Sequence, residues 1–209
     1  NAGRPREYGQ LLPALISDWR NKWQQDSLPF IFVQLPNFME VQYLPSESQW
    51  AELRFSQFKS LSVPNTAMVV TIDAGEWNDI HPLEKKIIGE RSALAAMKLA
   101  YGNETLISSG PLFRSAVREG NKIIIDFDNI GSGLEAKGGG DLDQFAVAGP
   151  DRRFVWAEAR IEENRIIVWS KEIKDPMYVR YAWADNPEGA NLYNIEGLPA
   201  SPFEAAATN

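Results

Sequence analysis

A single histidine follows a carboxylate by two residues in the stretch 73–81. His81 is the only histidine among 209 residues, and Asp79 precedes it. An imidazole beside a carboxylate is typical of a general base with its orienting partner, because the carboxylate sets the tautomer and favours the imidazolium. A structural interpretation competes with it, in which Asp79 caps a helix and His81 lies at the helix boundary. The spacing alone therefore predicts a candidate base and leaves both interpretations open.

A nucleophile for such a base is missing from the sequence. There is no cysteine, which excludes thiol catalysis, disulfides and zinc–thiolate sites. No G-x-S-x-G pattern occurs, and the later serines stand in no recognisable nucleophile elbow: Ser108, Ser109, Ser115 and Ser132. A serine nucleophile would therefore have to come from outside this chain. The aspartates at 126, 128, 141 and 143 lack the spacing of a known calcium loop, so we expect no metal and no cofactor.

Composition excludes several other classes of partner. The chain carries 21 Lys and Arg against 28 Asp and Glu, a net charge of −7, which disfavours nucleic acid because phosphate binding needs a basic surface. No run approaches the roughly 18 apolar residues that span a bilayer, so we expect no membrane span. With 44% hydrophobic residues, the chain has the composition of a folded globular protein.

The elements that must position His81 alternate between helix and strand. Apolar spacing and runs of β-branched residues predict helix 11–23, strand 29–35, helix 46–61, strand 67–73 and helix 82–101. Ser46 is the expected cap of the second helix, and Pro82 the expected first residue of the third. Strand–helix–strand order predicts a right-handed parallel unit, and both strands read as buried on both faces.

The pattern changes after about residue 105. Short alternating runs separated by turn residues predict strands at 121–128, 154–161, 165–170 and 177–184. We therefore expect an α/β part over 1–105, an antiparallel β-sandwich-like domain over 106–204 and a disordered tail over 205–209.

The predicted α/β part contains too few strands to be complete. A parallel sheet needs both faces covered and usually several strands, and neither predicted strand carries a central charge that would protect an edge. Further strands would come from another segment of the same product, a separate chain or a swapped partner. The alternative is that one of the two strands pairs with the β domain.

Two more residues share the edge where a ligand would lie. In open α/β sheets, ligands bind outside the carboxyl ends of the strands, where the loop 73–81 begins. Trp77 in that loop could stack on a sugar ring or simply pack in the loop. Gln34, at the end of the first strand, could bind a substrate hydroxyl or satisfy the loop backbone.

The loop also carries a family resemblance. The segment TIDAGEWNDIHPLEKKIIGERSALAAMKLAYG resembles the C-terminal catalytic block of bacterial sialate O-acetylesterases, in the SGNH (GDSL-like) hydrolase superfamily. Three other segments are similar to that family as well: NAGRPREYGQLLPALISDWR, FIFVQLPNF and YAWADNPEGANLYNIEGLPASPF. The resemblance covers nearly the whole chain and is to the second half of such an enzyme.

This resemblance implies a fold and a reaction. The fold would be the C-terminal half of a flavodoxin-like three-layer α/β/α domain with accessory β structure. The reaction would be hydrolysis of an O-acetyl ester on a sugar without a cofactor. His81 matches the family's histidine base, and Asn1 falls on the asparagine that donates to the oxyanion. The serine would lie in an N-terminal segment or chain, so this chain alone is expected to be inactive.

One position departs from the superfamily pattern. The residue three before the histidine is often Asp, but here it is Asn78. We therefore take Asp79 as the partner of His81, with Asp73 or a backbone carbonyl as alternatives. The acetylated sugar is left open, and a periplasmic or secreted location is expected, with the cytoplasm as the alternative.

A competing hypothesis needs no catalysis. The β domain could instead bind carbohydrate through its aromatic residues: Trp156, Trp169, Trp183 and Tyr193.

Overall fold

The computed structural model describes residues 1–208 and opens with a pair of parallel strands. β1 (Phe30–Val33) and β2 (Thr66–Val69) pair in parallel, from Phe30 opposite Thr66 to Val33 opposite Val69. The predicted parallel pair is confirmed, although each strand spans only four residues. Neither strand pairs with the β-rich part that follows.

Three α-helices accompany these strands: α1 (Pro5–Trp23), α2 (Gln49–Lys59) and α3 (Lys85–Leu99), with a short 3₁₀ turn, η1 (Ser60–Ser62), after α2. Ser46 is not the cap of α2, because Ser48 lies next to the helix and its hydroxyl accepts from the Ala51 N–H at 2.9 Å. Pro82 does not open α3 either. The helix begins after Glu84, whose carboxylate accepts from the Ile87 N–H.

Helix α1 has an inner and an outer apolar face. Leu12 and Ile16 are buried, whereas a row four residues apart is 46–60% exposed: Leu11, Leu15, Trp19 and Trp23, called here the outer stripe. The strand beside it is exposed too, since Val33 of β1 is 41% exposed. The expectation that both strands are buried on both faces is therefore wrong for β1, because nothing in residues 1–208 covers that side.

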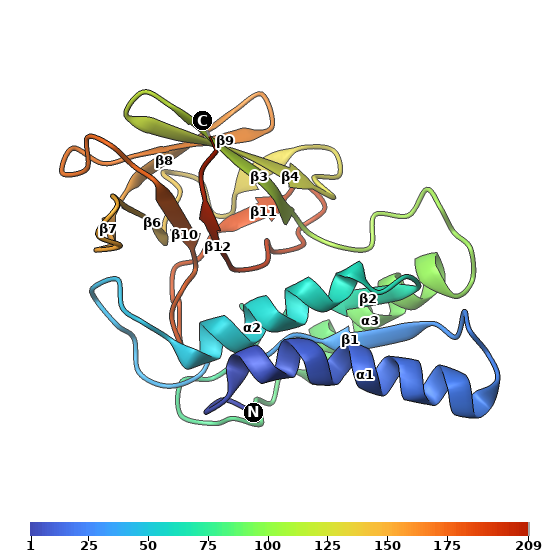
Figure 1. The fold of residues 1–209 in the computed structure, drawn as a ribbon. Coiled ribbons are helices and arrows are strands. Elements are labelled where there is room, and N and C mark those ends of the chain that lie inside the picture. The colour runs from blue at the N-terminus through green and yellow to red at the C-terminus, as the bar shows by residue number, and fades with distance from the viewer. Residues whose placement is uncertain (209) are drawn as a thin grey trace.

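The rest of the chain is antiparallel β structure, shown above the helices in Figure 1. One sheet has the order β3-β4-β9-β8 and a second has the order β12-β10-β6-β7, and β11 pairs with β5. The strands are β3 (Leu112–Glu119), β4 (Lys122–Asp128), β5 (Leu134–Ala136), β6 (Phe145–Ala148), β7 (Val155–Trp156), β8 (Glu158–Glu162), β9 (Arg165–Trp169), β10 (Tyr178–Tyr181), β11 (Leu192–Asn194) and β12 (Phe203–Ala206).

A continuous hydrophobic core joins the two parts of the chain. It contains residues from both four-stranded sheets, such as Ile123 and Val179, and also Met68, Val70 and Ile72 at the end of β2. The division expected at residues 105 and 106 falls in the coil between α3 and β3. Whether the parts are separate domains stays a prediction.

The expected disorder over 205–209 is wrong for residues 205–208. β12 pairs with β10, and Phe203 within it is fully buried against Phe113, Phe127 and Tyr181. Beyond the strand, the Ala207 N–H donates to Met177 O and the Thr208 N–H to Ala116 O. The chain end is ordered here because it pairs with β10 as the edge strand of the sheet. Residue 209 lies outside the described part.

Candidate functional site

The loop between β2 and α3 carries His81 in an exposed position. Two carboxylates of the loop fold it by accepting from its own backbone. Asp79 Oδ1 accepts from the His81 N–H at 2.7 Å, and Glu76 Oε1 accepts from the Leu83 N–H at 2.8 Å. The loop therefore presents its histidine to solvent at the carboxyl edge of the sheet, where ligands of α/β folds bind.

The carboxylate predicted to orient His81 contacts its main chain. Asp79 forms the side-chain-to-backbone bond of an Asx turn, which aspartate favours in loops. Within residues 1–208 the His81 imidazole has no hydrogen-bond partner. In this arrangement Asp79 sets the backbone of the histidine, and its role as the third member of a triad stays a prediction.

The alternative partner, Asp73, is occupied elsewhere. Its two carboxylate oxygens accept from Arg91 at 2.6 and 2.7 Å, and the Tyr193 hydroxyl donates to Oδ2 at 2.9 Å. Burial alone would raise the pKa of Asp73, but the hydrogen bonds and charge of Arg91, with the bond from Tyr193, outweigh it and hold that pKa below its usual value. Within residues 1–208 the Asp73 carboxylate is therefore bonded to Arg91 and Tyr193, and no hydrogen bond joins it to the imidazole.

Asn1 and Trp77 are both accessible. Asn1 is exposed, and its carbonyl accepts from the Arg4 N–H at 2.8 Å. Arg6, at the start of α1, bonds to Glu52 at the start of α2. The start of α2 is itself bonded to the loop after β1, through Trp50 and Pro36 O. The end of α1 that carries Asn1 therefore lies near the carboxyl end of β1. Trp77 is 57% exposed, and its stacking on a sugar ring stays a prediction.

Gln34 is held by the protein itself. The side chain is fully buried, and its amide donates to Arg54 O of α2 at 3.2 Å and to the Ser201 hydroxyl at 2.9 Å. Thr71, which follows β2, donates its hydroxyl to Gln34 O, so the two strand ends are hydrogen-bonded to each other. A contact between Gln34 and a substrate hydroxyl stays a prediction.

A buried arginine that the sequence did not single out holds the loop after β1. Arg54 is fully buried and donates to four backbone carbonyls: Leu35, Pro36, Ala184 and Asp185. Burial lowers the pKa of Arg54 to about 9, against the opposing charge of Asp185, so the side chain remains a cation at pH 7. Arg54 joins the loop at the sheet edge to the β-rich part. Sequence reasoning had no signal for this, because its four partners are main-chain atoms.

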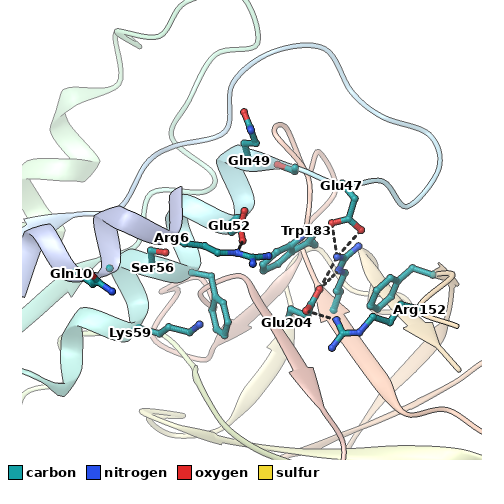
Figure 2. A pocket seen from close by; sticks show the side chains of 15 residues that line it. Arg6, Gln10, Glu47, Gln49, Glu52, Ser56, Lys59, Arg152, Trp183 and Glu204 are labelled. Carbon is teal, nitrogen blue, oxygen red and sulfur yellow. Dashed lines mark hydrogen bonds and ion pairs between the residues drawn. The ribbon is translucent and has the colours of Figure 1, made fainter. Parts of the chain in front are cut away.

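A large cleft lies elsewhere, between α1 and α2 on one side and β10 and β12 on the other (Figure 2). It has a volume of about 840 Å³ and is lined by aromatic and charged side chains. None of the residues predicted for the esterase site lines it, but Trp183, named for the competing carbohydrate-binding hypothesis, does. Most of its charges are paired: Arg180 binds Glu47 at 2.9 Å and Glu204 at 2.6 Å, and Arg6 binds Glu52. Lys59 forms no ion pair within residues 1–208, and its Nζ lies 4.3 Å from the centroid of the Phe55 ring.

The aromatic residues named for a carbohydrate-binding β domain do not form an exposed platform. Tyr193 is buried, Trp183 packs edge-on against Phe55, and Trp156 donates its indole N–H to Tyr43 O. Trp183 lines the cleft between the helices and the sheet, and carbohydrate binding by this part stays an alternative prediction.

Metal-binding clusters and membrane-spanning helices are both absent from the described residues. In residues 1–208, no three His, Cys, Asp or Glu side chains are placed to hold a metal ion. No helix in that part of the chain is long and apolar enough to cross a membrane.

Sialate O-acetylesterases are similar in sequence to nearly the whole chain. No family model matches the chain. Over 95–97% of its length, it is 28% identical to a sialate O-acetylesterase of Mus musculus and 26% identical to that of Homo sapiens. The resemblance to sialate O-acetylesterases is confirmed. The chain spans only 41–43% of the length of these curated relatives.

A solved structure is similar to nearly the whole chain. A carbohydrate acetylesterase from Xanthomonas citri superposes with a TM-score of 0.91 at 44% identity, over 95% of this chain and 46% of that one. The mixed architecture of an α/β part followed by several antiparallel sheets is therefore that of part of an acetylesterase.

Proposed function

We propose that this chain is the histidine-bearing part of a carbohydrate O-acetylesterase with an SGNH-type α/β/α domain. The observation that carries the proposal is the exposed position of the only histidine, on the loop that follows β2, in a chain 44% identical to a carbohydrate acetylesterase. The site needs no metal for this reaction, because an acyl transfer can proceed on a serine, a base and oxyanion donors.

The reaction would use His81 as the base. Its imidazole takes the proton of a serine hydroxyl, whose oxygen attacks the acetyl carbonyl, and Asn1 donates to the oxyanion that forms. The proton then passes to the sugar oxygen as the ester bond breaks and leaves acetyl-serine. Water attacks this second ester by the same route, which releases acetate and restores the serine. Trp77 would stack on the sugar ring, and Asp79 would hold the main chain of His81 in place.

The serine would come from a segment outside this chain. Two neighbouring surfaces support such a partner: the free edge of β1 and the outer stripe of α1. The two surfaces adjoin, because Trp19 of the stripe packs edge-on against Phe30 of β1 with 6.1 Å between the ring centroids. A parallel strand with one unpaired edge beside exposed aromatic rings has the features of a sheet that continues. The segment would add strands to β1 and cover the stripe.

The test is acetate release from O-acetylated sugars by the polypeptide that contains both the serine segment and this chain. We expect the His81→Asn variant to lower kcat about 10²- to 10⁴-fold, the usual contribution of a general base. The thermal midpoint of the variant should equal that of its parent, since His81 is exposed. Ser132→Ala, on a distant turn bonded to Glu196, is the matched control and should leave the rate unchanged.

The chain alone provides the second arm of this test. A serine-directed fluorophosphonate should label the complete polypeptide and not the isolated chain. Full turnover by the isolated chain, or a His81→Asn variant as active as its parent, would overturn the proposal.

A further inference from the structure

Two hydrogen-bonded links run from the β-rich part to the loop that carries His81. The first, the tyrosine link, starts at Tyr193 in β11. Its hydroxyl donates to Asp73 Oδ2 at 2.9 Å, and Asp73 is held on its other side by both arms of Arg91. Tyr193 is 3% exposed, so packing holds its ring in place and its hydroxyl reaches the loop from a fixed position.

The second, the asparagine link, starts at Asn186. Its side-chain oxygen accepts from Asn37 Nδ2 at 3.1 Å, and Asn37 Oδ1 in turn accepts from the Gly75 N–H at 2.7 Å. The Asn186 amide also donates to Met39 O at 2.9 Å, while the Met39 N–H donates to Trp77 O at 2.8 Å. One buried side chain thus reaches the His81 loop at residues 75 and 77, both times through the loop 36–39.

The contact between these two loops leaves no spare room. A Cβ added at Gly75 would lie 1.9 Å from the Asn37 carbonyl oxygen, so only glycine fits at this approach. Met39 has a φ of 74°, which costs free energy for a residue with a side chain and persists only where its surroundings hold it. The loops are therefore fixed against each other by geometry as well as by hydrogen bonds.

We infer that the β-rich part positions the His81 loop through these two links, and that Tyr193 and Asn186 are positioning residues of the esterase site. The inference rests on the proposed function in taking His81 as the base. A catalytic group must be held within about 0.5 Å of its working geometry, and buried neighbours usually supply that constraint. Here the carboxylates of Glu76 and Asp79 hold residues 79–83 of the loop. The first residues of the loop, 73–77, are instead held by the tyrosine link and the asparagine link.

Hydrogen–deuterium exchange on this chain tests the links without any activity. Tyr193→Phe keeps the ring and removes the hydroxyl, which should speed exchange in peptides covering 36–40 and 72–84 about tenfold or more, as expected for the loss of a hydrogen bond to a charged group. Peptides from β4 and β9 should be unchanged. The matched control is Tyr178→Phe, because in residues 1–208 the Tyr178 hydroxyl donates to no partner.

A second variant covers the case in which Tyr193→Phe unfolds the chain. Asn186→Ala should speed exchange in the same two peptides and broaden or shift the imidazole resonances of His81, which are unambiguous because there is no other histidine. Unchanged exchange in 72–84 for every variant that folds would overturn the inference.

Kinetics of the complete polypeptide separate positioning from mere stability. Tyr193→Phe should lower kcat about tenfold with little change in KM and should change the pH profile of kcat/KM, since the base would lose its orientation and not its substrate. Faster exchange together with an activity that does not need His81 would refute the proposed function and leave the links standing. Faster exchange with an unchanged kcat in a His81-dependent enzyme would refute the positioning role.

Discussion

The β-rich part and the α/β part of this chain differ in how completely they bury their apolar residues. Each strand of the two four-stranded sheets has a partner, and Ile123, Val168 and Leu192 are fully buried between them. The α/β part has a single pair of strands, and the outer stripe of α1 remains exposed. The β-rich part covers its own core. The α/β part contributes to that core on one side and leaves apolar side chains exposed on the opposite side.

This difference explains how a small loop can be held in an incomplete sheet. The end of β2 enters the closed core through Val70 and Ile72, and the loop that follows is tied to Tyr193 and Asn186. By this inference the β-rich part holds the start of the His81 loop, while the loop's own carboxylates hold residues 79–83. The open side is where the proposed serine segment would dock.

The largest effect should come from a matched pair of leucines, one in each part. Leu192→Ala in β11 should lower the free energy of unfolding by about 3 to 5 kcal/mol, because it leaves a cavity in a fully buried site. Leu15→Ala in the outer stripe, where the leucine is 48% exposed, should change it by less than about 0.5 kcal/mol. Urea unfolding measures both. Equal losses would mean that α1 is covered in solution, by self-association or otherwise, and would break the comparison.

A smaller effect is expected where the two parts meet. Asp73→Asn should cost roughly 2 to 3 kcal/mol at pH 7, since Arg91 and Tyr193 both lose a charged acceptor. The folded pKa of Asp73 lies below its usual value, so its contribution is present above about pH 4 and is lost as the pH falls through that lower pKa.

The difference in thermal midpoint between parent and Asp73→Asn should therefore shrink below about pH 4. Asp128→Asn, whose side chain is 58% exposed, is the control and should show little difference at any pH. A difference that stays constant from pH 7 to pH 3 would contradict the ionised link.

The smallest effect concerns the start of α2. Ser48→Ala should cost about 1 kcal/mol, because the hydroxyl caps the helix and also donates to Asp185 of the β-rich part. Ser46→Ala, two residues earlier, should cost almost nothing by the same chemical unfolding measurement. A reversed order would mean that the helix begins at 46 as the sequence pattern suggested.

Local chemistry was readable from the sequence. Runs such as FIFVQL and AMVVTID predicted the parallel pair, and the turn residues after 105 predicted the antiparallel part. The imbalance of two strands without further partners was also visible, because the number of strands is a property of the chain order. Element ends were less accurate: Ser46 and Ser48 are both good caps, and only the packing of α2 selects between them.

The sequence by itself determined the candidate base, since one histidine leaves no choice, and it determined the resemblance to sialate O-acetylesterases through segments spread along the chain. Only the tertiary structure decided the contacts of Asp73, Gln34 and Tyr193. Asp73 lies eight residues from His81 along the chain but is hydrogen-bonded to Arg91 and Tyr193, and Gln34 is buried and hydrogen-bonded to Ser201. Such assignments depend on contacts between residues 18 to 167 positions apart, and spacing along a chain carries no information about which distant polar groups will share a buried site.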